Sequence, residues 1–200
     1  MLYSLCNFQV RNSWDTPEKL MDHTFHSDRI TYMVRGPEIA PQVCEFYRKN
    51  YDFLKNTESL RQKSMYNEDS IRASLSAEYR LLLQKKAIRF WLFHRQMPDI
   101  VLGTVSFSHI MPGPYMRCYI GYKIDKDFLR MGYATEALSV TIPAVQKEYS
   151  LHRMEAFVQP SNIPSIRLME HMGFSQEGYL KEAIFINDTW MDHLLYARNF

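Results

Sequence analysis

The sequence has few cysteines, no long apolar run and no secretory pattern at its start. Its three cysteines, Cys6, Cys44 and Cys118, are widely spaced among 200 residues and form no CxxC pair. This spacing excludes a disulfide scaffold and a zinc knuckle, and it favours a reducing cytoplasm. No apolar run reaches the roughly 18 residues of a membrane span, so we expect no membrane partner. The first residues lack the charged-then-apolar order of a secretory signal, and we expect a cytoplasmic protein.

The sequence also lacks a charge of one sign. It has 24 lysines and arginines against 22 aspartates and glutamates, a formal net charge of +2. A dedicated nucleic-acid-binding protein usually carries a strong basic excess, so no nucleic-acid partner is expected. His23 and His26 lie close together, but no matching cluster of cysteine, aspartate or histidine accompanies them, so no metal site is expected.

What the chain does have is enough apolar material for one ordinary core, since 46% of its residues are hydrophobic. The 12 methionines and the 14% of aromatic residues are expected to fill that core or a contact between the subunits of a homodimer. There is no internal repeat, low-complexity tract or Gly/Ser linker. Because regular periodicity begins at Arg29, we divide the chain into an N-terminal appendage, residues 1–28, and one domain, residues 29–200.

Apolar periodicity and turn residues predict the elements of both parts. Asp15-Thr16-Pro17 predicts the start of a short helix over 18–23 in the appendage. In the domain, helices are expected at 38–54, at 68–86 with Asn67 as N-cap, at about 132–149 and at 162–171. Strands are expected at 30–34, 87–95, 100–109, 116–124, 153–158, 174–186 and 190–198, with turns at 97–99 and 187–188. The order β-α-α-β-β-β-α-β-α-β-β predicts an α/β fold with a mixed sheet.

The most informative segment is the strand 116–124, followed by a loop and a helix that begins at Gly132. A helix start after a loop offers unpaired backbone N–H groups and the positive end of a helix dipole, which together bind phosphate. Gly132 and Ala134 are small and let a phosphate approach the backbone. The same small residues also suit a tight loop chosen only for packing the helix on the sheet, and spacing alone favours neither explanation.

Motifs in the C-terminal part of the chain resemble those of one known family. In order, they are IGYKI (120–124), GYATEAL (132–138), NIPSIRLMEHMGF (162–174), EGYLKEA (177–183) and WMDHLLYAR (190–198). Together they resemble the GNAT superfamily of N-acetyltransferases, and within it the branch of ribosomal-protein N-terminal acetyltransferases. The segment 129–134 is similar to the family's pyrophosphate loop, Gln/Arg-x-x-Gly-x-Gly/Ala. Leu129 stands where the family has Gln or Arg, and Arg130 where it usually has Gly.

The resemblance implies a mixed, mostly antiparallel sheet flanked by helices, and acetyl-CoA as the acetyl donor. It also implies that backbone groups at the end of the strand hold the pantetheine arm and that amides of the loop hold the pyrophosphate. The residues assigned to acetyl-CoA on this basis are Tyr122, Lys123, Ile124, Leu129, Arg130, Met131, Gly132, Tyr133, Ala134, Thr135 and Asn162. Arg130 can add a charge-assisted contact to phosphate, and Asn162 is also the predicted N-cap of its helix.

Three further residues are candidates for catalysis. The resemblance places Ser165 near the CoA thiol, where a hydroxyl donor helps the thiolate to leave. Relatives have an acidic residue at the position of Ile184, and Glu182, two residues earlier on a strand, is expected to share that face and to act as base. The other interpretation of Glu182 is a solvated strand carboxylate. Tyr119 stands where this branch often has an acidic residue, and it would order a water or pack.

These residues predict an N-acetyltransferase that moves an acetyl group from acetyl-CoA to a primary amine by direct attack on the thioester. The acceptor is a protein N-terminal amine or a small amine. An α-amine, with a pKa of about 7.7–8.0, loses its proton more easily than a lysine at about 10.4. The alternative is a non-catalytic acyl-CoA-binding regulatory module, which the residues at 119, 129 and 184 suggest.

Overall fold

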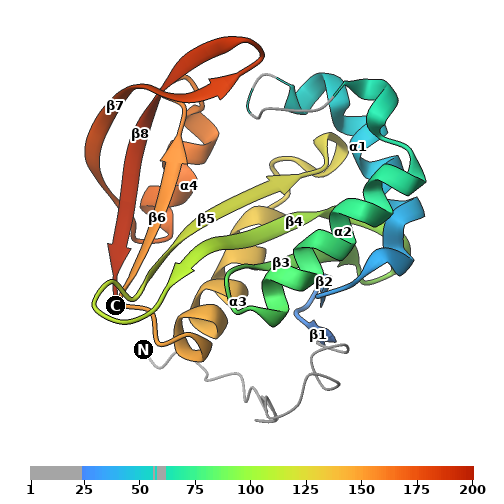
Figure 1. Ribbon diagram of the computed structural model, residues 1–200, viewed down its shortest axis with the longest axis horizontal. Coiled ribbons are helices and arrows are strands. Elements are labelled where there is room, and N and C mark those ends of the chain that lie inside the picture. The colour runs from blue at the N-terminus through green and yellow to red at the C-terminus, as the bar shows by residue number, and fades with distance from the viewer. Residues whose placement is uncertain (1–23, 56, 58–61) are drawn as a thin grey trace.

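The computed structural model describes residues 24–55, 57 and 62–200. Within this range the strands form one eight-stranded sheet in the order β1-β2-β3-β4-β5-β6-β8-β7 (Figure 1). The strands are β1 (Thr24–His26), β2 (Ile30–Met33), β3 (Ile88–His94), β4 (Met97–Met111), β5 (Arg117–Ile124), β6 (Arg153–Val158), β7 (Ser175–Ile186) and β8 (Thr189–Asn199). The helices are α1 (Ala40–Leu54), α2 (Glu68–Leu83), α3 (Tyr133–Glu148) and α4 (Ile163–His171), with short 3-10 turns η2 (Pro37–Ile39), η3 (Lys63–Met65) and η4 (Lys126–Phe128).

The sheet is mixed and mostly antiparallel, as expected, because β5 and β6 are its one parallel pair within the described chain. That parallel pairing is short and ends at Tyr119, which lies opposite Glu155. The antiparallel pairing of β5 with β4 continues to Ile124. After Tyr119, β5 therefore diverges from β6, and the sheet opens between them (Figure 1).

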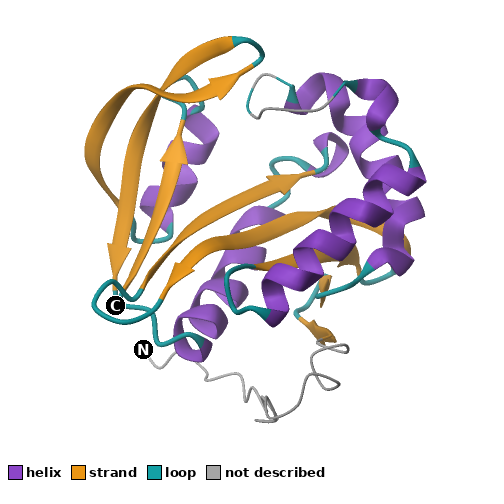
Figure 2. Ribbon diagram, viewed as in Figure 1, coloured by secondary structure: helices purple, strands orange, loops and turns teal. Residues whose placement is uncertain are grey.

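Helices cover both faces of the sheet (Figure 2). Alternate strand residues point to opposite faces, so neighbours such as Phe90 and Trp91 of β3 enter different cores. The larger core lies beneath α3 and α4, and the smaller core lies beneath α1 and α2. No helix in the described part of the chain is long and apolar enough to span a membrane.

The local signals at the starts of α1 and α2 are confirmed. Asn67 caps α2, its side-chain oxygen accepting a hydrogen bond from the Ser70 amide at 3.0 Å. The helix expected at 38–54 is divided into the 3-10 turn η2 and α1, with Pro41 in the first turn of α1 as the sequence requires. Helix α2 ends at Leu83 rather than at residue 86, because Lys85 adopts a positive φ of 55°.

The predicted turn at 97–99 is wrong. The hairpin between β3 and β4 turns at residues 95–96, and Met97 and Pro98 already belong to β4. Pro98 is tolerated there because the β3–β4 register shifts between Phe93 and His94, and a bulge relieves the need for a ladder N–H. The turn at Asn187 and Asp188 is confirmed, since both have the positive φ of a tight hairpin turn.

The N-terminal edge strand β1 was not predicted. Its three residues pair with β2, Thr24 lying opposite Met33, so the sheet includes residues before Arg29. A strand this short carries too little alternation to be recognised from sequence. The helix expected at 18–23 lies outside the described residues, and the division of the chain at residue 28 stays a prediction.

Candidate active site

The loop between η4 and α3 has the backbone shape of an anion site. Arg130 and Gly132 both adopt positive φ values, 60° and 81°. The first hydrogen bond inside α3 runs from the Glu136 amide to the Gly132 carbonyl at 3.0 Å. Among the described residues, no acceptor receives a hydrogen bond from the amides of 132–135, and residues 129–132 are exposed. Unpaired N–H groups at the positive end of a 16-residue helix are suited to binding a phosphate.

An ion pair from the β1–β2 turn holds this loop in place. Arg29 Nε lies 2.7 Å from Glu136 Oε2, and the Arg29 amide and the Ser27 hydroxyl donate to Oε1 at 3.0 and 2.6 Å. Arg29 also donates to the carbonyl of Met131 at 2.8 Å, and its guanidinium lies 4.4 Å from the centre of the Tyr133 ring. Burial of Glu136 opposes its ionisation, but the hydrogen bonds from Ser27 and Arg29 outweigh this effect and lower its pKa.

A second set of contacts holds the loop from α1. Lys49 lies 2.8 Å from a carboxylate oxygen of Asp125 and 2.8 Å from one of Asp127. The buried Asn50 side chain accepts a hydrogen bond from the Lys126 amide at 2.8 Å. Sequence analysis missed both sets of contacts, because they join residues far apart in the chain, such as Arg29 and Glu136, 107 positions apart. No local pattern signals such a pair.

The end of β5 offers a second backbone feature. Between Ile120 and Ile124 the strand pairs with β4 on one edge, whereas its other edge has no strand partner within the described chain. An unpaired strand edge presents N–H and C=O groups to whatever lies beside it. The pantetheine arm carries amide groups that can pair with such an edge, in the manner of an added strand. Tyr122, Lys123 and Ile124 lie on this edge of β5, and their contact with the pantetheine arm stays a prediction.

The start of α4 faces this edge across the sheet opening. Asn162 caps α4 as predicted, its Oδ1 accepting from the Ser165 amide at 3.2 Å. The hydroxyls of Tyr122 and Ser165 lie 2.7 Å apart, within hydrogen-bonding distance. Burial raises the pKa of Tyr122, and the hydrogen bond with Ser165 offsets part of that effect. The structure therefore brings together three of the predicted residues, and the Tyr122–Ser165 contact itself was not predicted.

Tyr119 lies on the opposite face of β5 from Tyr122, because the two residues are an odd number of positions apart along the strand. Its ring packs between His109 and Phe157, with ring centres 5.3 and 5.1 Å away. The nearby Glu155 is buried and bound by arginines, with Arg153 Nε at 2.6 Å. Because Ser165 contacts Tyr122, Tyr119 lies on the side of β5 away from Ser165.

The expected placement of Glu182 on the face of Ile184 is wrong. The β7–β8 register shifts between Leu180, which pairs with His193, and Ile184, which pairs with Met191. Glu182 lies inside this bulge with a φ of 50°, so the two-residue alternation that would align it with Ile184 is interrupted. The Glu182 side chain is exposed, and no described residue forms an ion pair or hydrogen bond with its carboxylate.

Asp192 stabilises this bulge. Its Oδ1 accepts from the Glu182 amide at 2.8 Å, and its Oδ2 accepts from the Tyr179 hydroxyl at 2.5 Å. The pKa of Asp192 is lowered, and the hydrogen bond from Tyr179 is the main cause. Both carboxylate oxygens of Asp192 therefore accept hydrogen bonds from within the β7–β8 hairpin, which supports a structural role.

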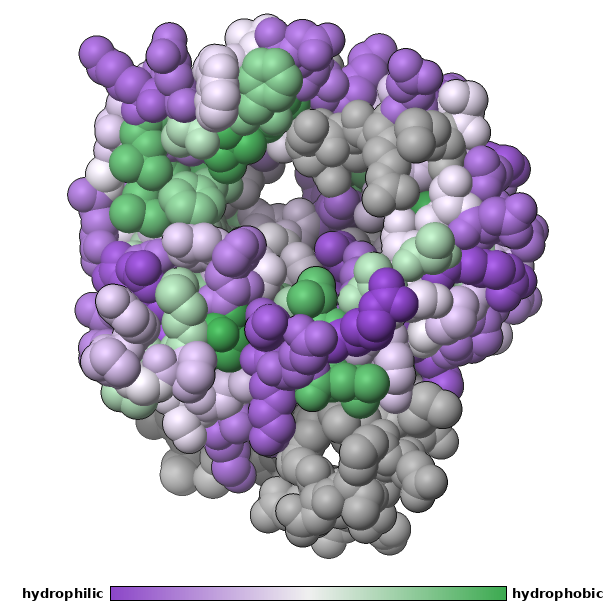
Figure 3. Space-filling model, in the orientation of Figure 1, coloured by the Kyte–Doolittle hydropathy of each residue, from purple (hydrophilic) through white to green (hydrophobic). Residues whose placement is uncertain are grey.

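The molecule is hollowed beside the β7–β8 hairpin in the space-filling view (Figure 3). The turn of this hairpin reaches the residue that follows α1, since the Asn187 side chain donates to the carbonyl of Lys55.

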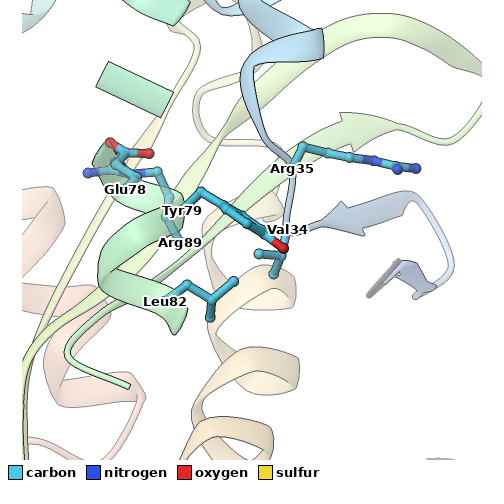
Figure 4. A pocket seen from close by; sticks show the side chains of 6 residues that line it. All are labelled: Val34, Arg35, Glu78, Tyr79, Leu82 and Arg89. Carbon is cyan, nitrogen blue, oxygen red and sulfur yellow. Dashed lines mark ion pairs between the residues drawn. The ribbon is translucent and has the colours of Figure 1, made fainter. Parts of the chain in front are cut away.

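A small recess elsewhere is not the substrate site. It is lined by Tyr79 and Leu82 of α2, by Glu78 and by residues after β2 and on β3 (Figure 4). Its volume is about 10 Å³, room for at most one water molecule. Glu78 and Arg89 at its edge form an ion pair at 3.0 Å, which accounts for their charges.

The described cysteines do not provide a nucleophile. Cys44 and Cys118 are buried and free, and burial raises the pKa of the Cys118 thiol to about 12. Little thiolate exists at neutral pH under those conditions.

An opened mixed sheet, an anion-binding helix start after β5 and a hydroxyl at the facing helix start define a CoA-dependent acyltransferase. Residues 40–175 match the family model of the acetyltransferase (GNAT) domain, and the chain belongs to this family. It is an acetyl-CoA-dependent N-acetyltransferase. The predicted family, fold, enzyme class and acetyl donor are therefore confirmed, and the non-catalytic alternative is not supported.

Two relatives of this family illustrate the similarity. The chain is 31% identical over 171 residues to the ribosomal protein uS5-alanine N-acetyltransferase of Escherichia coli, covering 86% of this chain and 88% of that protein. The crystal structure of the ribosomal-protein-S5-alanine acetyltransferase from Vibrio fischeri superposes with a TM-score of 0.83 at 25% identity, covering 89% of this chain and 97% of that one.

A third protein shows the same fold with a CoA derivative bound. Mycobacterium smegmatis RimJ in complex with CoA-disulfide superposes with a TM-score of 0.78 at 24% identity, covering 85% of this chain and 81% of that one. The roles of single residues in the present chain stay predictions.

Proposed function

We propose that this chain acetylates the α-amino group of a protein N-terminus. The observation that carries the proposal is the state of two carboxylates, Glu155 on β6 and Asp192 on β8. Glu155 is bound by arginines and Asp192 holds the β7–β8 bulge, so neither is free to remove a proton from a strongly basic amine. The site therefore favours an acceptor that is already partly neutral.

The pKa values of amines make this distinction large. Near pH 7.4, about a fifth to a third of protein α-amines are neutral, against about 0.1% of lysine side chains. An enzyme without a strong base thus gains roughly two orders of magnitude in reactive acceptor by using an N-terminus. Glu182, exposed and without a described partner, is the candidate that receives the remaining proton.

The named relatives support this choice of acceptor. The Escherichia coli relative is a ribosomal protein uS5-alanine N-acetyltransferase, and an alanine in a protein has a free amine only at the chain start. We propose the same class of acceptor here, a protein with a small N-terminal residue.

In the proposed reaction, the pyrophosphate of acetyl-CoA lies on the amides of Leu129–Thr135 and the pantetheine arm lies along β5. The nitrogen of the neutral amine attacks the carbonyl carbon of the thioester. The C–S bond then breaks. The thiolate leaves toward Ser165, whose hydroxyl donates a hydrogen bond to the sulfur. The ammonium proton passes to Glu182 or to water.

The test uses matched peptides, incubated with acetyl-CoA and the full chain and analysed by mass spectrometry. One peptide has a free N-terminal alanine and a blocked lysine, and the control has a blocked N-terminus and a free lysine. We expect a single acetyl group on the first peptide and none on the second. Acetylation of the lysine, or transfer only to small amines, would contradict the proposal.

A further inference from the structure

The hydroxyls of Tyr122 and Ser165 form a contact that the family resemblance did not provide. Tyr122 comes from the unpaired part of β5, and Ser165 from the first turn of α4 on the other side of the sheet opening. The two oxygens lie 2.7 Å apart in a partly buried position. Both groups thus border the place where the thioester must lie if the pantetheine arm follows β5.

Either hydroxyl can donate in this contact, since each carries one proton and one further acceptor site. Among the described residues, each is the other's one side-chain partner. When Tyr122 donates to Ser165 Oγ, the serine proton is free to point elsewhere, and this is the arrangement on which the proposal depends.

We propose that Tyr122 is a positioning residue, which orients the Ser165 hydroxyl as a donor toward the sulfur of CoA. This inference rests on the proposed role of Ser165 at the thiol, and it does not depend on the identity of the acceptor. Tyr122 keeps its proton throughout, since burial makes its hydroxyl a weaker acid than usual. The Tyr122 hydroxyl fixes the direction of the Ser165 O–H bond and polarises that bond, as expected for linked hydroxyls.

The test measures the pKa of the thiol in bound CoA, from the ultraviolet absorbance of the thiolate, without any acceptor. A free thiol has a pKa of about 8.5, and a donor aimed at the sulfur stabilises the thiolate and lowers that value. We expect the wild-type complex to titrate about one unit below Ser165→Ala, in line with a hydrogen bond to a charged group. Tyr122→Phe should lose most of that shift.

The double variant separates positioning from a general effect on the site. If Tyr122 acts through Ser165, the thiol pKa in Tyr122→Phe/Ser165→Ala equals that in Ser165→Ala alone. Tyr149→Phe is the matched control, because Tyr149 packs against the same core but lies at the far end of α3. It should titrate like the wild type.

Several results would overturn the inference. These are a wild-type thiol pKa equal to that of Ser165→Ala, a Tyr122→Phe value equal to the wild type, or additive effects in the double variant. Loss of CoA binding by a folded Tyr122→Phe would make Tyr122 a binding residue instead. Fluorotyrosine at position 122 keeps the size of the side chain and strengthens the donor, so it should lower the thiol pKa further, even if Tyr122→Phe does not fold.

This readout is independent of the proposed acceptor. A chain that acetylates only small amines would contradict the proposed function and leave the thiol measurement intact. Conversely, N-terminal acetylation with an unchanged thiol pKa in Tyr122→Phe would contradict the positioning role alone.

Discussion

The two sides of the sheet opening differ in the atoms that they offer. On the α3 side, the groups assigned to acetyl-CoA are mainly backbone amides at a helix start and an unpaired strand edge. On the β7–β8 side, the candidate groups are side chains around a bulge. A backbone site survives replacement of its side chains, whereas a side-chain site changes its chemistry with each residue. The departures at Leu129 and Arg130 are therefore less serious than those at Tyr119 and Ile184.

The largest expected effect lies where the two sides meet. Ser165→Ala removes the proposed donor to the leaving sulfur, and we expect kcat to fall about 100-fold. The Kd of acetyl-CoA should stay within about twofold, because the phosphate and pantetheine contacts are elsewhere. Steady-state kinetics with a verified acceptor and calorimetry measure the two quantities. Ser76→Ala on α2 is the control, and an unchanged kcat in Ser165→Ala would remove Ser165 from the mechanism.

Local signals in the sequence predicted the parts of the site that depend on neighbours in the chain. Asn162 and Asn67 were predicted as caps because capping needs only the next three residues. The Arg29–Glu136 pair, the Tyr122–Ser165 contact and the bulge at Glu182 depend on strands and helices meeting in space. Those features require the fold, and the family resemblance supplied the fold without these side-chain pairs.

The binding of acetyl-CoA should weaken when the contacts of Glu136 with Arg29 and Ser27 are removed. Glu136→Ala leaves Arg29 and Ser27 without their acceptor and frees the start of α3. We expect the Kd of acetyl-CoA to rise about tenfold, with kcat at saturating acetyl-CoA within about twofold. Glu148→Ala, in the last turn of the same helix, is the matched control. Equal affinities of Glu136→Ala and the wild type would show that the loop holds its shape without this ion pair.

The same contact predicts a pH dependence. The pKa of Glu136 is lowered in the folded protein, so its contribution is complete above the ordinary carboxyl pKa and is lost as pH falls through the lowered value. Acetyl-CoA affinity of the wild type should therefore hold down to the ordinary glutamate pKa of about 4.3 and decline as the pH falls below it. Glu136→Gln should bind more weakly at neutral pH and lack this decline. Titrations at several pH values would contradict the assignment if the two proteins showed parallel curves.

The acceptor side should respond through the proton of the amine. If Glu182 receives that proton, Glu182→Gln lowers kcat/KM about fivefold at pH 7. The loss should stay constant as the pH rises through the pKa of the α-amine, about 7.7–8.0, because Glu182 takes the proton only after the neutral amine has attacked. A pH–rate profile measures this. A loss that disappears above that pKa, or no loss at pH 7, would exclude Glu182 as the acceptor of this proton.

The smallest effects are expected from the departures in the loop itself. Leu129→Gln restores the family's residue and should leave the Kd of acetyl-CoA within about twofold, because the backbone amide is unchanged. Arg130→Gly should weaken binding about threefold at low salt, with the difference lost at high salt as the charge is screened. Large changes from either variant would show that side chains, rather than amides, hold the pyrophosphate.

The most direct test of the central claim is calorimetric titration of the full chain with acetyl-CoA, with adenosine diphosphate as the reference ligand. The structure predicts saturable binding at one site, much tighter than that of adenosine diphosphate, since the amides of Leu129–Thr135 and the open edge of β5 act together. No binding, or binding no tighter than that of adenosine diphosphate, would contradict a complete backbone site for acetyl-CoA.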